Sequence, residues 1–195
     1  MCWADLLRVL VPGIALGLVL GWVVSRRQVH LRRMRPSSWI RRARLMGARE
    51  WAELIALSIT VALVSLLISL KIGEAMLSAG IEMYSPEEFP FVGLMNYPVI
   101  MLLAVNLLPV FEEWIFRGIV IDELRRSTGS TALAVTASTL SFAVFHLTNP
   151  GTYIWYAIPL IPCGILLSLL YLRVGLGGAI LAHSAYNTLL FLLSL

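Results

Sequence analysis

The stretch from Phe111 to Gly118 places two glutamates and an arginine near the end of a long apolar run. On a helix, residues four positions apart share a face, whereas adjacent residues point about 100° apart. Glu113 and Arg117 can therefore form an ion pair, while Glu112 must find a partner on another helix or hold a proton. A carboxylate in that position can act as a general base. The alternative is a structural ion pair that joins helices, with Glu112 merely hydrogen-bonded.

Two further pairs, each with a histidine, follow at the same spacing. His146 lies four residues after Phe142, and Asn187 lies four residues after His183. Each pair therefore projects from one face of a helix. An imidazole beside an amide supplies two hydrogen-bond donors, which suits an oxyanion. Taken singly, each of these side chains is also explained as polar packing between helices.

Taken together, these side chains are costly to bury in an apolar segment, and a shared polar cavity accommodates all of them. A glutamate and a histidine can hold and deprotonate a water, and a second histidine with an asparagine can stabilise the oxyanion of amide hydrolysis. Glu112, His146 and His183 could equally bind zinc, which would activate the water itself. The residues leave both routes open, and we expect no cofactor, with zinc as the alternative. There is no H-E-x-x-H and no G-x-S-x-G motif.

In this order, the three motifs resemble the signature of the CPBP intramembrane protease family, which includes CAAX prenyl endopeptidases and Abi-type bacteriocin-processing or immunity proteins. The resemblance covers about residues 98–194 and rests on Glu112-Glu113-x-x-x-Arg117, Phe142-x-x-x-His146 and His183-x-x-x-Asn187.

This resemblance implies a role for each matching position. Glu112 would be the base, and His146 would help to hold the water. His183 and Asn187 would form the oxyanion site. The supporting ion pair would be Glu113 and Arg117.

The composition indicates the environment in which this site must work. Hydrophobic residues make up 59% of the 195 residues and charged residues 13%, with a mean hydropathy of +0.86. Soluble domains carry about 25% charged residues, so we predict an all-α polytopic integral membrane protein with a polar intramembrane cavity. A span needs about 20 apolar residues and must be helical in lipid. Six spans are predicted, at about 7–24, 51–70, 98–120, 131–147, 154–172 and 176–194.

Basic residues indicate the orientation of these spans. Of 15 lysines and arginines, nine lie within 26–49, so the loop 25–50 is expected in the cytoplasm and 71–97 outside. The first run is followed by Ser25-Arg26-Arg27 rather than by a cleavage site, and is read as a retained anchor. Anionic lipid is the expected partner near 26–49, and no nucleic acid is expected. We expect a bacterial or archaeal plasma membrane.

The chain divides into two predicted parts. Residues 1–97 hold two spans, the basic loop and a turn-rich external connection over 84–97, and residues 98–195 form a four-helix catalytic core. One difficulty concerns depth: at about 1.5 Å per residue, His183 lies roughly 10 Å and His146 roughly 20 Å from the cytoplasmic ends of their spans. Convergence therefore requires a tilted or re-entrant fourth helix, a later start for it, or a different boundary.

Three functions fit these features. The first is an intramembrane endopeptidase that cuts a membrane-proximal peptide or protein substrate. The second is a non-catalytic immunity or scaffold protein of the same fold, and the third is a small transporter that uses the carboxylates and histidines as a proton relay. The complete set of polar positions favours the first, and the lack of an inverted repeat argues against the third.

Overall fold

The computed structural model describes residues 3–85 and 96–193, and helices account for most of them. The turn-rich connection expected over 84–97 lies largely outside these residues. The helices are α1 (Trp3–Arg26), α2 (Val29–Met34), α3 (Pro36–Leu45), α4 (Ala48–Ser78), α6 (Pro98–Glu113), η1 (Trp114–Ile121), α7 (Asp122–Thr128), α8 (Thr131–His146), η2 (Ile154–Tyr156), α9 (Ala157–Val174) and α10 (Leu176–Leu193).

Five helical segments among the described residues are long and apolar enough to cross a membrane: Leu6–Arg26, Ala48–Ser78, Pro98–Thr128, Ile154–Val174 and Leu176–Leu193. The prediction of an all-α polytopic membrane protein is thereby confirmed. The fourth predicted span differs from the rest, because α8 has 16 residues. At about 1.5 Å per residue it is roughly 24 Å long, which is short of a hydrocarbon core of about 30 Å.

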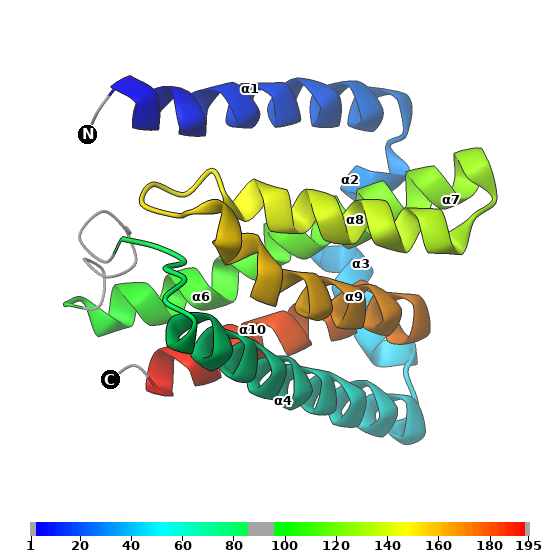
Figure 1. Ribbon diagram of the computed structural model, residues 1–195. Coiled ribbons are helices and arrows are strands. Elements are labelled where there is room, and N and C mark those ends of the chain that lie inside the picture. Colours follow the sequence, from blue (N-terminus) through cyan, green and yellow to red (C-terminus); the bar gives the residue numbers. More distant parts are fainter. Residues whose placement is uncertain (1–2, 86–95, 194–195) are drawn as a thin grey trace.

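Helices α4, α6, α8, α9 and α10 pack together with η1 into one bundle (Figure 1). Small residues permit close approach at its interfaces, as is usual between membrane helices. Ser58 on α4 donates a hydrogen bond to the carbonyl of Gly178 on α10 at 3.0 Å. Between α8 and α9, a Cβ at Gly164 would lie only 3.0 Å from the Cγ2 of Thr139. The bundle is thus held by backbone proximity as well as by apolar side chains.

The basic segment folds against one end of the bundle, which we call the basic end. This segment forms two short helices, α2 and α3. Arg33 donates to the carbonyl of Gly118 at 3.0 Å, and Arg42 donates to the carbonyl of Val174 at 2.8 Å. His30 is 1% exposed, and its Nε2 lies 2.8 Å from the carboxylate of Glu123. Several arginines of this segment therefore bind the bundle directly.

Candidate active site

A buried ion pair forms the base of the site. The Glu113 carboxylate accepts a hydrogen bond from Arg117 Nη1 at 2.8 Å, and both side chains are fully buried. The pairing predicted from their four-residue spacing is present. The same Glu113 oxygen, Oε1, lies 2.8 Å from Nδ1 of His183 on α10. Glu113 therefore connects α6 to His183 on α10 and also binds Arg117, four residues later in the chain.

Arg117 lies within η1, an eight-residue stretch of π-helix that directly follows α6. Such segments are rare and occur often at functional sites. From η1, Arg117 Nη2 donates to the carbonyl of Gly164 on α9 at 3.2 Å. Its guanidinium also lies 4.4 Å from the ring centre of Phe142 on α8. One arginine thus holds three elements in register around the site.

In both histidines the ring nitrogen Nδ1 is fixed by a partner, but the two partners differ. Nδ1 of His146 lies 2.9 Å from the carbonyl of Phe142, and a carbonyl can only accept, so Nδ1 carries the proton. Nδ1 of His183 faces the Glu113 carboxylate, which also accepts. In both neutral rings, Nε2 is therefore the unprotonated nitrogen. This pattern gives each imidazole a free lone pair on the same side of the site.

Glu112 faces both of these lone pairs. Its Oε2 lies 3.7 Å from Nε2 of His183 and 4.0 Å from Nε2 of His146. The expectation that Glu112 points away from Arg117 toward other helices agrees with these distances. They are too long for direct hydrogen bonds, yet a single water could contact Glu112 and an imidazole at once. The side chains of Glu112 and His146 are 18% and 16% exposed, so this part of the site is accessible.

Asn187 stands one turn further along α10 than His183. Its amide nitrogen lies 3.4 Å from the carbonyl of Val105 on α6. The structure therefore brings together Glu112, Glu113, Arg117, His146 and His183, and places Asn187 beside them on the same helix as His183.

The depth difficulty is resolved by the lengths of the two hairpins. Figure 1 shows that the α7–α8 turn extends beyond the α9–α10 turn at the basic end of the bundle. Helix α8 thus begins farther out than α10. Its last residue, His146, and His183 on α10 both lie near the same Glu112 oxygen.

Sequence reasoning missed Gly164, whose carbonyl is a partner of Arg117. A glycine in an apolar helix suggests close packing but does not indicate which side chain its carbonyl will accept. It also missed the role of Glu113 toward His183, because no spacing rule relates residues on different helices.

The donor types at this site are those that zinc prefers, but their spacing is wider than zinc requires. Bonds of about 2.0–2.1 Å place tetrahedral ligands about 3.4 Å apart. Glu112 Oε2 is 3.7 and 4.0 Å from the two imidazole nitrogens. Within residues 3–85 and 96–193, no group of three His, Cys, Asp or Glu side chains is arranged to hold a metal ion. The residues as positioned do not fit a zinc centre.

Fold and site together define an integral membrane protein with a polar site between its helices. Residues 87–189, just over half of the chain, match the family model described as type II CAAX prenyl endopeptidase Rce1-like. The chain belongs to this family of CAAX-type intramembrane proteases. No curated protein and no solved structure matches the chain.

Proposed function

We propose that the protein is an intramembrane endopeptidase that hydrolyses a peptide bond of a membrane-proximal substrate without a metal ion. The observation that supports this most strongly is the convergence of Glu112 Oε2 on the Nε2 atoms of His146 and His183. Membership of a CAAX-type protease family supports the same reaction class.

In the proposed first step, a water lies between Glu112 and His146. The Glu112 carboxylate accepts one water proton, and the lone pair on Nε2 of His146 accepts a hydrogen bond from the other. The water oxygen then forms a bond to the substrate carbonyl carbon, and the carbonyl π pair moves to oxygen as an oxyanion. The site needs only the carboxylate and one fixed imidazole for this step.

The oxyanion would be stabilised by His183 and Asn187. Nε2 of His183 can donate to the oxyanion only when both ring nitrogens carry a proton, with Nδ1–H directed at the Glu113 carboxylate 2.8 Å away. Asn187 would supply the second donor from its amide.

The reaction is completed by the proton held on Glu112. The oxyanion reforms the carbonyl, the C–N bond breaks, and Glu112 returns its proton to the leaving amine. The products are a carboxylic acid and an amine, and the enzyme regains its starting protonation state. Glu113 and Arg117 touch neither water nor substrate in this scheme; they hold His183 in place.

Positive-inside asymmetry favours a cytoplasmic position for the basic end, in a bacterial or archaeal plasma membrane. A cavity of about 550 Å³ at this end is lined by basic, acidic and apolar side chains, including Arg41, Arg42 and Arg173. Arg41 and Arg42 belong to the exposed face of α3. We propose that this part of the segment 26–49 contacts anionic lipid headgroups.

The alternative function is a non-catalytic immunity or scaffold protein with the same fold. Cleavage assays decide between the two: purified protein is incubated with a panel of membrane-proximal peptides, prenylated and unprenylated. Asn187→Ala should reduce turnover, whereas the matched amide variant Asn106→Ala, whose side chain bonds Leu102 and Thr188, should not. Equal effects of the two variants would refute the oxyanion role. Absence of cleavage by wild type across the panel would favour the scaffold.

A further inference from the structure

Helix α1 lies outside the region that matches the protease family and is barely packed. None of the apolar window in its span, Leu6–Arg26, is buried. Figure 1 shows α1 running alongside α8 but apart from the other helices. At one end it continues into α2, which binds the bundle. At the other end, a charged side chain reaches across.

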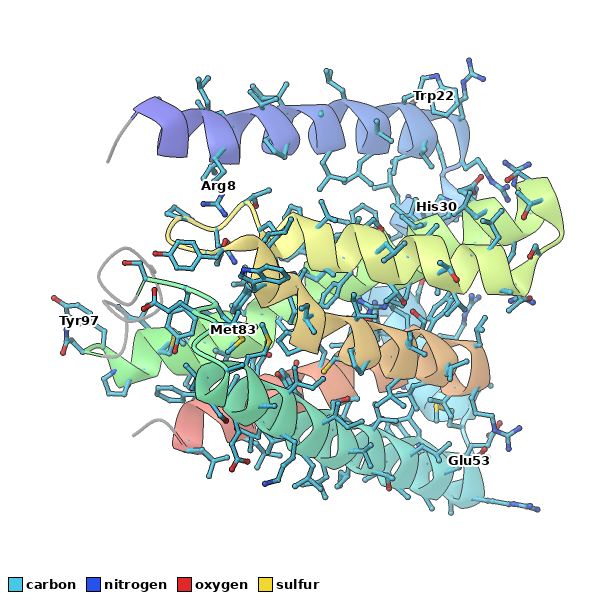
Figure 2. All side chains as sticks on the ribbon, viewed as in Figure 1. Arg8, Trp22, His30, Glu53, Met83 and Tyr97 are labelled. Carbon is cyan, nitrogen blue, oxygen red and sulfur yellow. The ribbon has the colours of Figure 1, made fainter. Side chains whose placement is uncertain are left out.

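That side chain is Arg8. Figure 2 shows it pointing from α1 toward the loop that follows α8. Its Nε donates to the carbonyl of Leu147 at 2.6 Å. Its Nη2 donates to the hydroxyl of Thr152 at 2.9 Å and also to the Thr152 carbonyl. The guanidinium fork thus closes both ends of the loop 147–152, a geometry that a lysine cannot reproduce.

The loop begins immediately after His146. Thr152 is 1% exposed. Within the loop, its hydroxyl donates a hydrogen bond to the carbonyl of Asn149 at 2.8 Å. On the opposite side, the amide of Tyr153 donates to the carbonyl of Met83 at 2.9 Å. The backbone after His146 is therefore held from two sides, and one of these is α1.

His146 depends on this anchoring because it is the last residue of α8. Within the described part of the chain, its side chain makes one hydrogen bond, from Nδ1 to the carbonyl of Phe142 on its own helix. The end of a helix frays unless its final carbonyls are bound, and Arg8 binds the carbonyl of the very next residue. A charged residue in an apolar span is also costly to insert, so its presence there indicates a function.

We propose that Arg8 is a positioning residue: by fixing the loop 147–152, it keeps Nε2 of His146 directed at Glu112. This inference rests on the proposed function of His146. It gives α1 a part in the reaction that goes beyond membrane anchoring, although α1 carries no catalytic residue.

The test compares Arg8→Gln with Arg26→Gln, a matched change at the other end of α1, where Arg26 lies over the ring of Trp22. The chain has three histidines, so ¹⁵N-histidine labelling in detergent gives few resonances to assign. Arg8→Gln should shift the His146 ring signals and leave those of His30 unchanged. It should lower kcat on the order of 10- to 100-fold, as expected for a small misplacement, with KM nearly unchanged. Arg26→Gln should do neither.

Two further variants keep the inference testable. Arg8→Lys keeps the charge but not the fork, so it should recover only part of the turnover. Thr152→Val removes one acceptor without changing α1 and should give a smaller shift of the His146 signals in the same direction. It replaces Arg8→Gln if that variant does not fold.

Unchanged His146 signals in Arg8→Gln would overturn the proposal, and so would full activity with shifted signals. Full recovery by Arg8→Lys would overturn the role of the fork. If wild type cleaves no substrate, the proposed function fails, whereas the histidine spectra still decide whether Arg8 positions His146.

Discussion

Replacing Arg117 with methionine tests the buried ion pair at the base of the site. Methionine keeps much of the apolar stem and removes the guanidinium. Glu113, which is fully buried, would then retain His183 as its polar partner among the described residues. Breaking a buried pair by removing one partner costs about 3–5 kcal/mol, because the remaining charge is uncompensated.

The magnitude can be isolated with a double-mutant cycle. Arg117→Met should lower the free energy of unfolding by about 3–5 kcal/mol, measured by denaturant titration in mixed micelles. Glu113→Gln combined with Arg117→Met removes both charges and should recover a large part of that loss. The control is Arg126→Met, because Arg126 pairs with Glu123 on the surface with 57% of its side chain exposed. An exposed pair is worth about 0–1 kcal/mol.

Two results would refute this reasoning. The first is a free energy of unfolding for Arg117→Met within about 1 kcal/mol of the wild-type value, which is the loss expected for an exposed pair. The guanidinium would then not belong to a buried ion pair. If the double variant is no more stable than Arg117→Met, the loss comes from packing against Phe142 rather than from the stranded carboxylate.

Three further predictions concern the cofactor, the packing and the lipid. Exhaustive chelation should leave cleavage intact and metal analysis should find less than one zinc per chain; loss of activity that added zinc restores would establish the metal route. Gly164→Ala should destabilise the protein by about 1–3 kcal/mol through overpacking against Thr139. The control Gly21→Ala should not, because a Cβ at Gly21 would have no atom within 4 Å. Equal stability of the two variants would contradict the close α8–α9 contact. Arg41→Gln and Arg42→Gln should each weaken retention of anionic lipid through purification by about 1 kcal/mol, with no effect on neutral lipid, as read by mass spectrometry of bound lipids.

The sequence predicted most of the site because helix spacing is a local rule. Glu113 and Arg117 could be paired from their four-residue separation alone, and the scarcity of polar groups predicted that Glu112 would meet the histidines. What could not be predicted was which carboxylate each histidine would contact. Glu113 binds Nδ1 of His183 at 2.8 Å, a contact set by how α6 and α10 pack.

The fold was predictable to a similar degree. Composition and apolar runs predicted an all-helical membrane protein, and five spans satisfy the length that a bilayer requires. The fourth apolar run, at about 131–147, forms the shorter helix α8, because the chain turns directly after His146. The docking of the basic segment through His30 and Arg33 could not be foreseen, since charge patterning predicts a membrane surface but not specific acceptors such as Glu123. The division at residue 97 stays a prediction.

The most direct test of the central claim is peptide cleavage by Glu112→Gln. Glutamine keeps the size of the side chain but cannot accept a proton from water. We predict a loss of turnover on the order of 10²- to 10⁴-fold, with unchanged unfolding and with substrate retained on the purified variant. The matched variant Glu53→Gln, at an exposed pair with Arg173, should cleave like wild type. Turnover by Glu112→Gln equal to that of wild type would contradict the claim that Glu112 is the base.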